Sequence, residues 1–95
     1  MKILITLTRT NTGRIQLSYV RSTNERGGIG TGASLPPFNP NAMAEIEAIL
    51  SNLGVDDNAI RDSVSRVRQS GPGELVKVAD LDVAENVLTE NGFAM

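Results

Sequence analysis

The chain has 95 residues, a formal net charge of −2 and 40% hydrophobic residues, and only three of its residues are aromatic. It contains no cysteine and no histidine, which excludes disulfides, thiolate metal sites and the side chain that most often acts as a general base near neutral pH. The length suits one modest core, and the acidic balance argues against a general nucleic-acid binder, whose affinity rests on a basic surface.

The distribution of apolar residues predicts a single domain over residues 1–95. Its expected parts are a β-hairpin at 1–21, a Gly/Pro-rich loop at 22–39 and an α-α-β-α unit at 40–95. The apolar run near the start, Ile3-Leu4-Ile5, is too short for a signal-peptide core or a membrane span. We therefore expect a cytoplasmic protein that does not bind a membrane.

Two segments in which apolar residues alternate predict the antiparallel hairpin. The apolar positions are Ile3, Ile5 and Leu7 in residues 2–10, and Ile15, Leu17 and Tyr19 in residues 14–21. Between the segments, Gly13 can take the left-handed conformation that closes a short loop.

The loop at 22–39 contains Gly28-Ile-Gly30-Thr-Gly32, which is similar to a phosphate-binding loop. A dinucleotide fingerprint leaves a strand and opens directly onto a helix, but here Leu35-Pro-Pro-Phe-Asn-Pro40 intervenes. A Walker loop also needs a lysine, and none lies between Lys2 and Lys77. We expect a linker and no cofactor.

The same loop also offers apolar and charged anchors for a partner protein. Arg26, Ile29, Leu35 and Phe38 would be the contacts if the loop orders on binding. The alternative is that Leu35 and Phe38 pack on the rim of the domain itself.

Two helices are predicted after the loop. Asn39 with Pro40 starts the first, and its apolar stripe is Met43, Ile46, Leu50 and Leu53. Gly54 ends that helix, and Asp56 or Asp57 then caps a second helix whose stripe is Ile60, Val64 and Val67. Gly71-Pro72-Gly73 terminates the second helix.

A short third strand at 75–79 and a last helix complete the chain. Asp82 has capping-box spacing to Glu85 for this helix, with Asp80 as a competing cap. The order β-β-α-α-β-α predicts an α+β two-layer sandwich: a three-stranded antiparallel or mixed sheet with helices on one face. Its open face would carry Leu4, Val20, Leu75 and Ala79, and an apolar open face favours self-association.

The acidic residues cluster at predicted helix starts, at Asp56-Asp57 and at Asp80, Asp82 and Glu85. Acids at these places cap backbone amides and face the positive end of the helix dipole. Capping explains them without a metal, so we expect no metal site and no catalytic residue.

The second predicted helix carries Arg61, Ser65 and Arg68 at spacings of four and three, on the face away from its apolar stripe. Arg66 lies nearby, but Asp62 is placed to pair with it. These residues are either a solvated face or a small patch for an acidic partner. The two helices joined at Gly54 are also similar to a helix-turn-helix, although the acidic charge weighs against DNA.

Residues 44–93 resemble the C-terminal domain of the ribosomal stalk protein and the Clp protease adaptor that shares its fold. The similar features are the helix-Gly-helix unit broken at Gly54, the Ser70-Gly-Pro-Gly73 turn and the segments Val76–Glu85 and Glu90–Gly92. The resemblance implies an α+β protein-binding module. The lysine-rich factor-binding surface of the stalk domain is not matched, and no functional residue is carried over.

Together these patterns predict a non-enzymatic protein-protein interaction or adaptor module without a cofactor. The alternative is a self-associating structural subunit, such as a homodimer. A minor alternative is an accessory nucleic-acid binder that uses the second helix.

Overall fold

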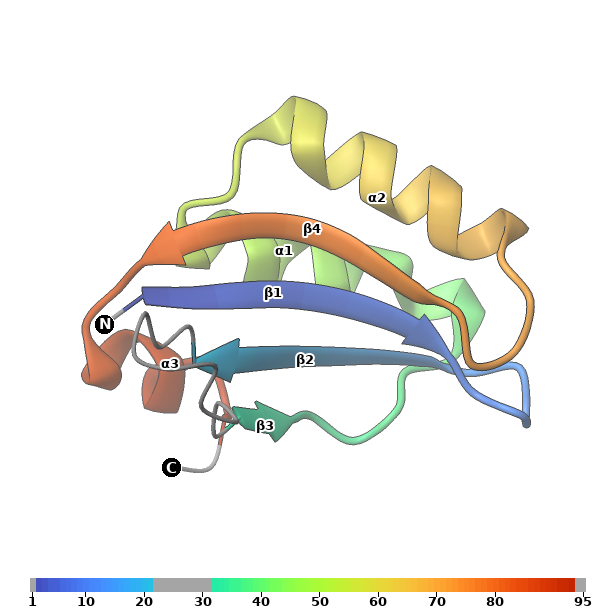
Figure 1. The fold of residues 1–95 in the computed structure, drawn as a ribbon, viewed down its shortest axis with the longest axis horizontal. Helices are drawn as coiled ribbons and strands as arrows, with labels where there is room; N and C mark the ends of the chain where they lie inside the picture. The colour runs from blue at the N-terminus through green and yellow to red at the C-terminus, as the bar shows by residue number, and fades with distance from the viewer. Residues whose placement is uncertain (1, 22–31, 94–95) are drawn as a thin grey trace, which may run out of the picture.

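The structure is a computed structural model that describes residues 2–21 and 32–93. Within these residues, four antiparallel strands form one sheet in the order β3-β2-β1-β4. The sheet and its helices make the chain α+β, as predicted (Figure 1). The predicted three-stranded sheet is wrong by one strand.

The elements follow the order β-β-β-α-α-β-α, with a 3-10 turn before the first helix, in place of the predicted β-β-α-α-β-α. They are β1 (Lys2–Arg9), β2 (Ile15–Arg21), β3 (Gly32–Ser34), η1 (Pro40–Ala42), α1 (Met43–Leu53), α2 (Asp57–Gln69), β4 (Leu75–Asp82) and α3 (Glu85–Glu90).

The predicted hairpin is confirmed as β1 and β2. Gly13 has a φ of 79°, the left-handed conformation that the short loop requires. Leu7 lies opposite Leu17 and Ile5 lies opposite Tyr19, so the two apolar faces coincide. All four side chains are at most 5% exposed, which makes this face the floor of the core.

Strand β3 lies inside the segment that was predicted to be a loop. Ser34 pairs with Ser18 and Ala33 with Tyr19. Farther on, Phe38 exchanges two backbone hydrogen bonds with Ile15 (2.7 and 2.9 Å). Glycine, alanine and serine have little intrinsic strand propensity, so this strand depends on the edge that β2 offers and not on its own sequence.

Strand β4 is longer than the predicted 75–79, because it continues to Asp82. A β-bulge interrupts its pairing with β1: Lys77 lies opposite Thr6, whereas Ala79 lies opposite Ile5. The extra residue, Val78, turns Ala79 toward the helices. The expectation that Ala79 lies on the open face is therefore wrong, because it assumed an unbroken alternation.

The end of α1 and the start of α2 lie where their capping residues predict, but the predicted start of the first helix at Asn39 and Pro40 is instead the 3-10 turn η1, capped by Asn39, and α1 begins only at Met43. The Asp56 side chain accepts a hydrogen bond from the Asn58 amide, which caps α2. Gly54 has a φ of 98°, and the amide of Val55 returns to the carbonyl of Leu50 at 3.0 Å. This Schellman-type end reverses the chain, so that α2 runs back over the sheet.

Helix α3 begins at Glu85, and its N-cap is Ala84, which makes no side-chain hydrogen bond. The predicted caps, Asp80 and Asp82, are instead part of β4, so that expectation is wrong. In the sequence these aspartates alternate with Leu81, and the alternation outweighs the capping-box spacing.

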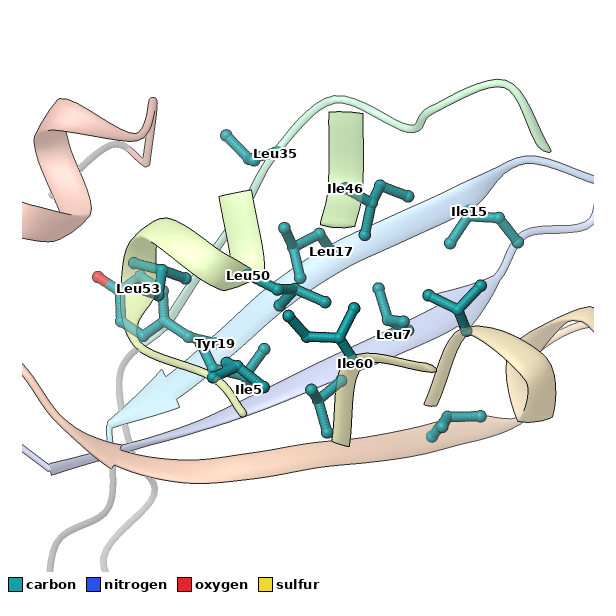
Figure 2. Close-up of a cluster of buried hydrophobic side chains, with 14 of the residues drawn as sticks. Ile5, Leu7, Ile15, Leu17, Tyr19, Leu35, Ile46, Leu50, Leu53 and Ile60 are labelled. Carbon is teal, nitrogen blue, oxygen red and sulfur yellow. The ribbon is translucent and has the colours of Figure 1, made fainter. Parts of the chain in front are cut away.

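The core is one aliphatic layer between the sheet and the helices. Figure 2 shows Ile46, Leu50 and Ile60 of α1 and α2 pointing toward Leu7 and Leu17 of the sheet. Helix α3 closes the same side, because Phe93, just beyond it, meets Tyr19 edge-on with ring centroids 5.2 Å apart. The three helices thus cover one face of the sheet. None of the helices in the described part of the chain is both long and apolar enough to cross a membrane.

The turn at Gly54 gives a direct test of this architecture. We expect Gly54→Ala to lower the free energy of unfolding by about 1 kcal/mol, because alanine is strained in the left-handed conformation. An added Cβ would meet no atom within 4 Å, so the loss would be conformational. Urea denaturation measures it.

The matched control is Gly71→Ala. Gly71 has no positive φ, and its added Cβ would make an ordinary 3.5 Å contact with Glu74. We expect this variant to match the wild-type protein. Equal destabilisation of both variants would contradict the assigned role of Gly54.

Candidate functional site

The exposed face of α2 brings together the three residues that the sequence singled out on this helix. Arg61, Ser65 and Arg68 are all exposed. The neighbouring stripe is buried: Ile60, Val64 and Val67. Seven residues at 1.5 Å each separate Arg61 from Arg68 by about 10 Å along the helix. The α2 stripe, as we call Arg61, Ser65 and Arg68, is therefore a short row of polar side chains.

Local interactions hold α2 in place at both of its ends. The Asp56 cap fixes the start, and the Ser70 hydroxyl donates to the carbonyl of Val67 at 2.8 Å at the end. Arg66 and Arg68 lie in the last turn, where positive charge is favourable beside the negative end of the helix dipole. The basic residues thus stabilise the helix that displays them.

The arginines of α2 differ in whether they have an acidic partner. Arg66 pairs with Asp62 at 3.1 Å, as their spacing predicted. The side chains of Arg61 and Arg68 form no ion pair or hydrogen bond with any residue that the structure describes. Two positive charges about 10 Å apart on one helix face are therefore free to meet an external anion.

Arg9 ties strand β1 to the end of α2. Its guanidinium Nη2 donates to the backbone carbonyl of Arg68 at 3.0 Å. Its Nε is buried without a hydrogen-bond partner among the described residues. Arg9 therefore helps to fix the backbone from which the Arg68 side chain projects.

A shallow groove of about 450 Å³ runs between α1 and α2 at the Arg61 end of the stripe. Its lining residues are Glu47, Ser51, Asp57, Ile60 and Arg61. Two of these residues are acidic, so the groove partly balances the charge of Arg61. Arg68, in the last turn of the helix, lies outside this lining.

The predicted loop anchors do not join the α2 stripe. Leu35 is 6% exposed and belongs to the core, and Phe38 packs against that core. Both lie beside β2, whereas α2 packs on β1 and β4. Arg26 and Ile29 lie outside the described residues. The rim-packing alternative therefore describes Leu35 and Phe38.

Three of the carboxylates that the sequence singled out have structural partners. Asp56 caps α2, Glu85 pairs with Arg21 at 3.1 Å, and Asp80 pairs with Lys77 at 3.0 Å. Within residues 2–21 and 32–93, no group of three carboxylates comes together in a way that could hold a metal ion. The sequence does not indicate the Lys77–Asp80 pair, because Asp80 also occupies a typical helix-cap position.

The open face of the sheet carries more hydroxyls than apolar groups. Leu4, Val20 and Leu75 lie on it as expected, and Val20 and Leu75 are 41% and 66% exposed. Thr6 and Ser18 lie between these positions, and the hydroxyls of Ser18 and Ser34 form a hydrogen bond of 2.8 Å. Val20 and Leu75 therefore do not form one continuous apolar patch, which weakens the case for self-association through this face.

Comparison of the chain with protein-family models, with curated proteins and with solved structures finds no match. The resemblance to the ribosomal stalk domain and the Clp adaptor therefore remains an expectation. What the protein does has to be inferred from its own surface.

The α2 stripe can be altered without harming the fold, and this can be measured. We expect Arg61→Gln and Arg68→Gln to change the free energy of unfolding by less than about 0.5 kcal/mol, because both side chains are exposed and unpaired. Asp62→Asn should lower the free energy of unfolding by a similar amount, which is what an exposed i,i+4 ion pair contributes. Urea denaturation checks all three, and a loss above about 1 kcal/mol would show that the stripe is structural.

Proposed function

We propose that this protein is a non-enzymatic interaction module that binds an acidic segment of another protein through the α2 stripe. The observation that carries the proposal is that Arg61 and Arg68 are exposed and have no described partner, whereas Arg66, Arg21 and Lys77 each have one. Exposed arginines with a free guanidinium fork favour bidentate contacts with carboxylates.

The spacing of the two arginines specifies the kind of segment that fits. Carboxylates about 10 Å apart would meet both guanidinium groups. A helix presents such a pair on one face at positions i and i+7, whereas residues i and i+3 of an extended segment point to opposite sides. The Ser65 hydroxyl lies between the arginines and can donate to, or accept from, the same segment.

A non-enzymatic role is favoured by where the ionisable groups lie. Among the described residues, every aspartate, glutamate, lysine and arginine is at least partly exposed. General acid-base catalysis relies on burial or close charges to move a pKa toward neutrality. A protein partner is also favoured over nucleic acid, because α2 carries Asp57 and Asp62 besides its arginines and the net charge is −2.

The test uses two synthetic alanine-based helices of equal charge. One carries glutamates seven residues apart, on one face, and the other carries them five residues apart, on opposite faces. Titration into the ¹⁵N-labelled protein, followed by NMR, should shift the α2 amides more strongly with the first peptide. Binding should weaken as salt exceeds about 0.1 M, where charges more than roughly 10 Å apart are screened.

Variants then assign the effect to the stripe. Arg61→Gln and Arg68→Gln should each weaken binding by roughly two- to fivefold, which is what one exposed ion pair is worth. Asp62→Asn frees the Arg66 side chain from its ion pair and should strengthen binding of the peptide. Arg14→Gln is the matched control, because Arg14 is an exposed, unpaired arginine outside α2.

Equal binding of both peptides, or binding that survives the loss of Arg61 and Arg68, would contradict the proposal. Tighter binding of a DNA duplex than of the first peptide, lost in the same variants, would replace it with the nucleic-acid alternative.

A further inference from the structure

Strand β4 is one edge of the sheet, and no strand among residues 2–21 and 32–93 pairs with its outer side. It pairs with β1 on one side only. In the described part of the chain, no backbone hydrogen bond joins residues 75–81 to any element except β1. Residues 75–81 of this strand therefore present a row of amides and carbonyls on the outer side, the template on which another strand can add.

The β-bulge gives this edge a symmetric pattern. The open-face residues of β4 are Leu75, Lys77, Asp80 and Asp82, and the helix-side residues are Val76, Val78, Ala79 and Leu81. Read from either end, the order is open, helix, open, helix, helix, open, helix, open. The order of open-face and helix-side residues is therefore symmetric about the bond between Val78 and Ala79.

A strand with this pattern matches a second copy of itself in one antiparallel register. With a two-fold axis at the Val78–Ala79 bond, every open-face residue lies opposite an open-face residue along all of β4. A shift of one or two residues in either direction places helix-side residues opposite open-face residues at the centre. Matching faces are what set the register of a sheet with one buried side.

Charge supports the same register. Lys77 would lie opposite the partner's Asp80, and Asp80 opposite the partner's Lys77. Within one chain these two residues already pair at 3.0 Å, because the bulge brings them to the same face. Opposite charges on directly facing residues stabilise a strand pair, whereas like charges there destabilise it.

We propose that two copies of this chain join along β4 to form a continuous eight-stranded antiparallel sheet. Its strand order would be β3-β2-β1-β4-β4-β1-β2-β3, from two sheets of four. A bulge and a charged residue normally discourage pairing at a sheet edge. In β4 the bulge instead makes the strand self-complementary, and the charges attract in that register.

The proposal is independent of the function assigned to the α2 stripe. Helix α2 packs against β4 and β1, and Figure 1 shows it running alongside β4. The dimer would carry two α2 helices on the same face, related by the two-fold axis. Loss of binding at α2 would leave the dimer intact, so the two proposals can fail separately.

The decisive experiment uses charge-reversed variants that complement one another. Lys77→Asp alone places aspartate opposite the partner's Asp80, and Asp80→Lys alone places lysine opposite the partner's Lys77. Both single variants should dissociate at least about tenfold more readily than the wild-type dimer. An equimolar mixture of the two restores both opposite-charge pairs, so the dimer should re-form as a heterodimer.

Sedimentation equilibrium over a dilution series measures this. The chain has a mass of 10.1 kDa, so the wild-type protein should move from that mass toward twice it as concentration rises. Arg14→Asp, an equal charge change at an exposed residue away from β4, is the control and should dimerise like the wild type. Circular dichroism of each variant at low concentration confirms that the monomer is folded.

Hydrogen exchange supplies a second measurement that needs no variant. Outward-pointing amides of β4 should exchange slowly at high protein concentration and rapidly at low concentration. A wild-type protein that stays monomeric up to millimolar concentration would overturn the proposal. So would a dimer that survives both charge reversals, or a mixture of the variants that fails to associate.

Discussion

Burial of one face of the sheet is the constraint on which the rest of this structure depends. Ile5, Leu7, Ile15 and Leu17 are fully buried, and their strands alternate, so the opposite face must point away from the helices. With only three aromatic residues in the chain, close packing of branched aliphatic side chains has to supply most of the stability. Every helix that the structure describes therefore lies on the same side.

The same constraint explains which elements could be predicted from the sequence. The hairpin and the two central helices could be predicted, because their apolar spacing, Gly54 and the Asp56 cap all indicate the same elements. Strand β3 could not, because Gly32, Ala33 and Ser34 have no strand pattern of their own and pair only because β2 offers an edge. The local sequence cannot indicate a pairing edge that forms only when distant strands come together.

The C-terminal third shows a conflict between two local signals. The spacing of Asp82 and Glu85 is typical of a helix start, whereas the alternation through Asp80, Leu81 and Asp82 is typical of a strand. The strand prevails because Leu81 can then lie opposite Ile3 and pack against the core. The bulge at Val78 could not be predicted either, because only the pairing with β1 shows that β4 has one extra residue there.

For the candidate site, sequence spacing predicted the Arg66–Asp62 pair but could not decide the state of Arg61. Asp57 lies four residues before Arg61, a spacing that would also have suggested a pair, yet the structure shows none. The two cases differ in their place on the helix, since Asp57 is its first residue and lies at the positive end of the dipole. An ion pair between exposed side chains contributes so little free energy that such local differences determine whether the pair forms.

The ionisable residues that the structure describes are all at least partly exposed, so both proposals concern outer surfaces of the protein. In the described part of the chain the buried polar residues are Thr6, Ser63 and Ser70, and no carboxylate or amine joins them. Two surfaces remain with unsatisfied groups: the α2 stripe, which offers charge, and the β4 edge, which offers backbone donors and acceptors. They adjoin, because α2 packs on β4. A chain that pairs through β4 would present two α2 stripes from one rigid sheet, and two weak ion-pair sites held together bind a repeated acidic partner far more tightly than one alone. The weakness of a single exposed site is therefore a reason to expect both surfaces to act together.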